Sequence, residues 1–137
     1  MIQFLLAAPR SGSGKTTMTC ALLMALKRRG YTPCAFKSGP DYIDPMFHSH
    51  VIGAKSSNLD PFFFDRDTMR YLLAHNGQDC DVTVIEGVMG YYDGLGLTST
   101  RASTYEAARE TESPVVLVVN ARGAALSVLA AGGGFLP

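Results

Sequence analysis

Short apolar runs alternate along the chain with segments in which apolar residues recur every three or four positions. The apolar runs are typical of strands buried on both faces of a parallel sheet, and they cover residues 2–8, 33–36, 82–85 and 114–119. The helical spacing predicts helices over residues 15–29, 45–51, 65–75, 103–111 and 124–131. This alternation predicts an α/β fold with a mostly parallel sheet and helices on both faces.

The connections that follow the first three strands are too rich in glycine, proline and aspartate, or in glycine and serine, for regular structure. They cover residues 9–14, 37–45 and 87–100, and residues 58–63 are also expected to be a loop. The carboxyl ends of parallel strands meet at one edge of a sheet, where open α/β folds bind ligands. Sheets commonly have about five or six strands. With four strands predicted, we expect the fold to be incomplete at its C-terminal end.

The segment between the first strand and the first helix has the composition and position of a phosphate-binding loop. It departs from the pattern G-x-x-x-x-G-K-[ST] at Pro9, where a glycine is usual. Its glycines let backbone N–H groups turn towards phosphates, its lysine reaches the outer phosphates, and the next threonine offers a hydroxyl to magnesium. We predict that nucleotide phosphates are bound by Arg10, Ser11, Gly12, Ser13, Gly14, Lys15, Thr16 and Thr17.

Two alternatives accompany this prediction. In the first alternative, the whole segment is a glycine-rich turn that contains a lysine by chance and binds no phosphate. Arg10 stands where one branch of P-loop proteins carries a second lysine that reaches across a dimer, and an arginine there could bind phosphate. The alternative is that Arg10 is a solvated surface arginine. A homodimer therefore stays open.

Acidic residues follow the second and third strands. Magnesium commonly takes one or two carboxylates together with phosphate oxygens and water, so Thr16, Asp41 and Glu86 are expected to hold it. Glu86 ends the apolar run 82–85, where an unpaired charge is unfavourable, and it is expected to face a cation. Asp44 and Asp93 remain for substrate or a second ion, although loop aspartates also serve as turn formers.

Composition excludes several classes of protein. The 137 residues suit one domain, and 12 basic and 12 acidic side chains give a net charge of zero. Without a basic excess, neither nucleic acid nor an anionic membrane is an expected partner. No apolar run approaches the roughly 20 residues of a membrane span. Three scattered cysteines without C-x-x-C spacing favour a reducing cytoplasm.

Two other groups of side chains are expected to be structural. His48 and His50 lack a third ligand nearby, which favours a surface or packing role over a metal site. The aromatic runs 62–64 and 91–92 are expected to pack against the rest of the chain.

Five collinear stretches resemble the cobyrinic acid a,c-diamide synthase family. They are APRSGSGKTT (8–17), FKSGPDYIDPMFH (36–48), NLD (58–60), VIEGVMGYYDG (84–94) and PVVLVV (114–119). The K-x-G-P-D-Y-I-D-P stretch separates this family from cobyric acid synthase and dethiobiotin synthetase. The resemblance implies a P-loop NTPase-like fold and an amidoligase, dependent on ATP and Mg²⁺, that acts on acetate side chains a and c of a corrin-type tetrapyrrole in cobalamin biosynthesis. ATP would phosphorylate a carboxylate, and ammonia would displace the phosphate.

The resemblance also implies roles for individual residues. Gly12, Gly14, Lys15 and Thr16 would bind the triphosphate, and Asp41 and Glu86 would hold magnesium. The catalytic residues would be Lys37, Asp44 and Asp93, of which Lys37 assists phosphoryl transfer. The substrate and acyl-phosphate end of the site would be formed by Asp41, Tyr42, Asp44 and Asp93.

Family members continue with a glutamine amidotransferase domain that releases ammonia with a cysteine nucleophile. We expect residues 1–137 to be part of the ATP-binding synthetase domain, without an amidotransferase domain, so ammonia must come from another source. Two alternatives stay open. One is a non-catalytic nucleotide-binding fragment, and the other is a dimerising P-loop switch protein, which predicts lysine at the position of Arg10.

Overall fold

The computed structural model describes residues 2–39, 41 and 43–135, and this part of the chain forms a parallel sheet of five strands. Their order across the sheet is β3-β2-β4-β1-β5. The strands are β1 (Ile2–Ala7), β2 (Pro33–Ser38), β3 (Lys55–Leu59), β4 (Val82–Glu86) and β5 (Val115–Leu117). Glu86 of β4 lies in register with Leu6 of β1 and Lys37 of β2. The three central strands therefore end at nearly the same level, and their following loops start side by side.

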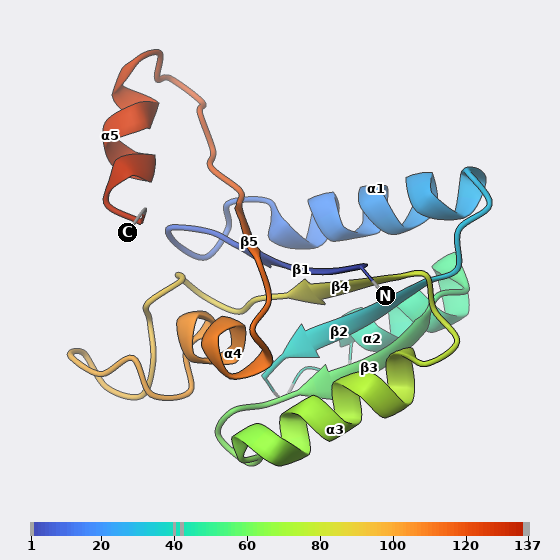
Figure 1. Ribbon diagram of the computed structural model, residues 1–137. Coiled ribbons are helices and arrows are strands. Elements are labelled where there is room, and N and C mark those ends of the chain that lie inside the picture. Colours follow the sequence, from blue (N-terminus) through green and yellow to red (C-terminus); the bar gives the residue numbers. More distant parts are fainter. Residues whose placement is uncertain (1, 40, 42, 136–137) are drawn as a thin grey trace.

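Helices lie on both faces of this sheet (Figure 1). One face is covered by α1 (Lys15–Arg28) and by the π-helical turn η1 (His48–Ile52), which continues from α2 (Ile43–Phe47). The other face is covered by α3 (Arg66–Gly77) and α4 (Thr104–Thr111). A last helix, α5 (Ser127–Gly133), lies outside these layers. No helix in the described residues is both long and apolar enough to span a membrane.

The core consists of two apolar layers, one on each face of the sheet. Successive residues of a strand point to opposite faces. Leu5 accordingly joins the layer that contains Met69 of α3, whereas Leu6 joins the layer that contains Leu23 of α1. This arrangement explains why β1, β2 and β4 are apolar without alternation. It confirms the predicted α/β, P-loop NTPase-like fold with a parallel sheet between helices.

Local signals at the helix ends were also informative. Ser103 Oγ accepts a hydrogen bond from the backbone N–H of Glu106 at 3.2 Å, as the capping-box spacing predicts. The carboxylate of Glu106 reaches back to the N–H of Ala102, one residue before the expected position. The predicted start of α4 is therefore confirmed.

Several sequence predictions were wrong in detail. Strand β3 was missed, because its sequence KSSNL is polar and the strand lies at the sheet edge. Lys37 and Ser38 belong to β2 and not to the following loop, because their backbone continues the parallel ladder with its neighbours. Residues 43–45 begin α2. Strand β5 spans only Val115–Leu117, and its valines are exposed because β5 is the other edge.

Candidate active site

The loop between β1 and α1 has the backbone of an anion cradle. Gly12 and Gly14 have φ angles of +73° and +96°, in the left-handed region that a Cβ atom disfavours. A Cβ built at either glycine would meet nothing within 4 Å, so the conformation rather than crowding requires glycine, and the space beside it is open. Ser13 Oγ donates to the carbonyl of Arg10 at 2.9 Å and closes the turn. The first backbone N–H groups of α1 follow directly, and such groups attract anions.

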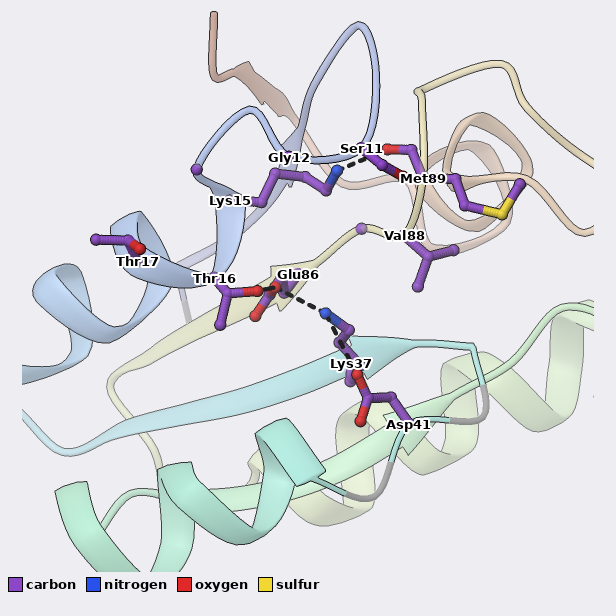
Figure 2. A pocket seen from close by; sticks show the side chains of 12 residues that line it. Ser11, Gly12, Lys15, Thr16, Thr17, Lys37, Asp41, Glu86, Val88 and Met89 are labelled. Carbon is purple, nitrogen blue, oxygen red and sulfur yellow. Dashed lines mark hydrogen bonds and ion pairs between the residues drawn. The ribbon is translucent and has the colours of Figure 1, made fainter. Parts of the chain in front are cut away.

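A cavity of about 460 Å³ lies between this loop and the ends of β2 and β4. Figure 2 shows side chains from all three elements around it. The cavity is lined by Ser11, Gly12, Gly14, Lys15, Thr16, Thr17, Lys37, Asp41, Glu86, Gly87, Val88 and Met89. Most of these positions belong to the predicted phosphate loop or to the predicted acidic loops, so the fold brings the two motifs to one place.

Lys37 lies at the centre of an ion-pair cluster. Its Nζ donates to Asp44 Oδ2 and Glu86 Oε1, both at 2.7 Å, and lies 3.8 Å from Asp41 Oδ2. Thr16 Oγ1 donates to the same Oε1 of Glu86 at 2.5 Å. The side chain of Glu86 is fully buried and that of Lys37 is 7% exposed. The expectation that Glu86 faces a cation is met by Lys37.

Lys37 and Asp44 each stabilise the charged form of the other. Burial disfavours the charged form of Lys37, but hydrogen bonds from its ammonium to Asp44 and Glu86 outweigh this, and the pKa of Lys37 lies above its ordinary value. Burial would likewise raise the pKa of Asp44, but Lys37 outweighs it and lowers that pKa. Both groups are therefore charged at neutral pH.

Lys15 lies across the cavity from the β4 strand end. Its Nζ donates to the carbonyl of Met89 at 2.6 Å and so joins the phosphate loop to the loop after β4 (Figure 2). Burial lowers the pKa of Lys15, and the positive charge of Lys37 lowers it further. The carboxylates of Glu86 and Asp93 raise this pKa, but by less. A phosphate in the cavity would offer this ammonium a stronger partner than a neutral carbonyl does.

Other predicted residues lie elsewhere or have a local role. Arg10 is exposed and does not line the cavity. Asp41 Oδ1 accepts from the N–H of Ile43 at 2.9 Å and so caps the start of α2, while its other oxygen faces Lys37. Asp93 is exposed and accepts from the N–H of Gly90 at 3.0 Å. Tyr42 lies outside the described residues.

Sequence reasoning placed Asp44 at the substrate end and gave His48 a packing role. In the structure, Asp44 Oδ2 lies 3.4 Å from Thr16 Oγ1, beside Glu86. His48 is fully buried, and its Nε2 lies 3.9 Å from Glu86 Oε2. Burial lowers the pKa of His48, and this outweighs the carboxylates of Glu86 and Asp44, which raise it. Asp44 was predicted to lie in the loop before the helix at 45–51, but it belongs to α2, which continues into η1 with His48. The spacing of four between the two residues could have placed both on one helical face only if the predicted helix had begun earlier.

A second, apolar cavity of about 380 Å³ adjoins the first and shares Val88 and Met89 with it. Phe62 and Phe63 line it and are 49% and 67% exposed, so the prediction that they pack into the protein was wrong. They lie in the turn after β3, outside both core layers. Asp60 and Asp93 also line this cavity. Tyr91 packs against the core layer that contains Met69, as expected, whereas Tyr92 is 39% exposed and contacts the rings of Tyr91 and Tyr105.

The oxygen donors beside the phosphate loop fit Mg²⁺. Mg²⁺ usually takes one or two carboxylates and completes its shell with phosphate oxygens and water. Thr16 and the carboxylates of Glu86, Asp44 and Asp41 supply such donors, and Thr16 Oγ1 lies 2.5 Å from Glu86 Oε1 and 3.4 Å from Asp44 Oδ2. Within the described residues there is no preformed cluster of three or more His, Cys, Asp or Glu side chains around a metal position. This donor set therefore suits a cation that is held jointly with a nucleotide.

Comparison with protein families decides the class of this fold. Residues 4–125 match the family described as CbiA, the CobQ/CobB/MinD/ParA nucleotide binding domain. The chain belongs to this family. Its phosphate loop and cavity occupy the matched region, as expected of a CobQ/CobB/MinD/ParA nucleotide-binding domain.

Similar proteins of this chain include a,c-diamide synthases. The chain is 46% identical over 136 residues to the cobyrinate a,c-diamide synthase of Listeria innocua, covering 98% of the chain and 30% of that protein. It is 42% identical over 134 residues to the hydrogenobyrinate a,c-diamide synthase of Streptomyces coelicolor, covering 98% of the chain and 28% of the relative. The resemblance predicted from the five motifs is thereby confirmed. The chain spans less than a third of the length of these relatives.

Proposed function

We propose that this chain forms the nucleotide-binding part of an amidoligase, which uses ATP to activate carboxylates of a corrin-type tetrapyrrole such as cobyrinate or hydrogenobyrinate for amidation. The observation that carries the proposal is the cluster beside the phosphate loop in which the buried Lys37 and Glu86 meet the exposed Thr16. The relatives, which are named for this reaction, supply the substrate class.

The phosphate loop would hold the triphosphate. Open N–H groups around Gly12 and Gly14 would contact phosphate oxygens, and Lys15 would exchange the Met89 carbonyl for one of them. Ser11 and Thr17 line the same cavity and would add contacts. Positioning of this kind is the main contribution that proteins make to phosphoryl transfer.

Thr16 and Glu86 would hold Mg²⁺, with Asp41 or Asp44 beside them. When bound, the ion neutralises charge on the transferred phosphoryl group. Lys37 would supply a second positive charge at the ends of β2 and β4, where its two carboxylate partners fix its ammonium. Charge on the carboxylate acceptor repels a phosphoryl group, and these cations would reduce that repulsion.

The macrocycle would be seated in the apolar cavity next to the phosphate site. Its wall of Phe62, Phe63 and Leu95 offers apolar surface to a large ring, and Asp93 at its edge would lie near the amidated side chain. The shared residues Val88 and Met89 connect this cavity to the phosphate site. A carboxylate of the ring would then reach the nucleotide while the ring itself stays outside.

The remaining parts of the proposal concern the surroundings of this chain. Residues 1–137 would be part of a synthetase domain, and ammonia would come from a glutamine amidotransferase domain or from free ammonia. The three free cysteines favour a reducing cytoplasm. A homodimer is a further expectation, for which Arg10 is the candidate contact.

Amidation with free ammonium tests the proposal directly. The full chain is incubated with ATP, Mg²⁺, ammonium and cobyrinate, and mass spectrometry follows ADP and the amidated macrocycle. We expect ADP formation that requires the macrocycle, and loss of both products in Lys37→Met. Lys55→Met is the matched control, because Lys55 is exposed on β3 and outside the site. A folded chain that binds ATP and yields neither ADP nor amide would refute the amidoligase function.

A further inference from the structure

His48 is a buried polar side chain that has no role in the reaction as proposed. It is fully buried at the start of η1, and its Nε2 faces Oε2 of the equally buried Glu86 at 3.9 Å. Within the described residues, neither ring nitrogen of His48 has a hydrogen-bond partner, and nor does Oε2 of Glu86. Buried polar groups are nearly always hydrogen-bonded, so two unpartnered groups that face each other call for an explanation.

We propose that His48 is a positioning residue whose Nε2–H donates a hydrogen bond to Glu86 Oε2 and thereby keeps Oε1 directed at Thr16 and Lys37. The two oxygens of Glu86 then have separate partners, because Oε1 already accepts from Thr16 and Lys37. The present distance of 3.9 Å is about 1 Å longer than an N–H···O hydrogen bond, so the proposal requires side-chain rotations that bring Nε2 and Oε2 together.

The backbone around His48 suits such a role. The carbonyl of His48 accepts from the N–H of Ala54 at 2.9 Å, which closes the turn. Lys27 donates to the carbonyls of Ile52 and Gly53 at 2.9 and 2.8 Å and ties the end of η1 to α1. Helix α1 begins at the phosphate loop and Lys27 lies in its last turn, so these bonds connect the segment that carries His48 to the helix that follows that loop.

The consequence concerns the magnesium affinity of the site. Partners behind a metal-binding carboxylate fix its orientation, and their loss typically lowers metal affinity about 10- to 100-fold. Because this role rests on the nucleotide function proposed above, it predicts a loss that appears with Mg²⁺ and is absent without it. A histidine that merely fills space would alter folding stability but not this difference.

Calorimetric titration of the full chain with a non-hydrolysable ATP analogue, in Mg²⁺ and in EDTA, separates the two roles. His48→Leu should bind the magnesium form about tenfold or more weakly, with binding in EDTA unchanged. His48→Gln keeps an N–H donor and should recover most of the loss. His50→Gln is the matched control, because His50 is exposed in the same turn. Equal losses in both conditions, no loss in His48→Leu, or no recovery in His48→Gln would overturn the proposal.

A second measurement needs neither nucleotide nor a variant at His48. Nitrogen-15 NMR of the nucleotide-free wild-type chain reports which ring nitrogen of His48 carries a proton. We expect a proton on Nε2 whose resonance shifts in Glu86→Gln. A bare Nε2, or no response to Glu86→Gln, contradicts the assignment. If wild type binds no nucleotide, the proposed function fails, and this spectrum still decides the role of His48.

Discussion

Replacement of Lys37 by methionine tests whether the ion-pair cluster is held together as the geometry indicates. Methionine keeps much of the apolar stem of the lysine and removes its ammonium. Glu86, fully buried, then loses its partner at 2.7 Å and keeps the hydroxyl of Thr16. Breaking a buried pair by removing one partner typically destabilises a protein by about 3–5 kcal/mol. The cluster opens onto a cavity that admits water, so we expect the lower end, about 3 kcal/mol.

The assay is urea unfolding followed by circular dichroism, with a double-mutant cycle. Glu86→Gln in the Lys37→Met background removes the unpaired charge, and the double variant should recover about 2 kcal/mol relative to additivity. Lys55→Met, at an exposed position on β3, should change the unfolding free energy by less than about 0.5 kcal/mol. A loss below about 1 kcal/mol in Lys37→Met, or simple additivity in the double variant, would refute this account of the cluster.

Three further predictions concern individual residues. Glu86→Gln should weaken nucleotide binding in Mg²⁺ by about 1–3 kcal/mol more than in EDTA, measured by calorimetry, and equal losses would argue against a metal role. Gly14→Ala should destabilise the chain by about 1–2 kcal/mol in urea unfolding, because its φ of +96° strains any side chain, and an unchanged midpoint would contradict this. Lys37 lowers the pKa of Asp44 below its ordinary value near 4, so the pair adds stability above that pH and loses it as pH falls through the folded-state pKa. The stability difference between wild type and Asp44→Asn should therefore be constant from about pH 5 to 8 and shrink below about pH 4, and a change within the upper range would count against the pairing.

The sequence was most informative where one physical constraint dominates. Strands buried on both faces must be apolar throughout, and β1, β2 and β4 could be found for that reason. A phosphate loop needs glycine at left-handed positions followed by lysine and threonine, and residues 10–17 show this pattern. Topology then explains why motifs about 70 positions apart meet, as Thr16 and Glu86 do.

Features that depend on long-range partners could not be predicted. Lys37 looked like a loop residue, because a lysine inside a buried strand is favourable only with Glu86 in register beside it. Strand β3 carries mostly polar side chains, so no apolar run marks it in the sequence. Its strand conformation follows from its backbone pairing with β2. His48 could not be distinguished from a surface histidine without knowing which carboxylate it faces.

The most direct test of the central claim is calorimetric titration of the full chain with a non-hydrolysable ATP analogue in the presence of Mg²⁺. The account predicts saturable binding to one site, abolished in Lys15→Ala and retained in Lys55→Ala, with circular dichroism showing that all three chains are folded. Equal affinity in wild type and Lys15→Ala, or no binding by a folded wild-type chain, would contradict the claim that the loop at residues 10–17 is the nucleotide site.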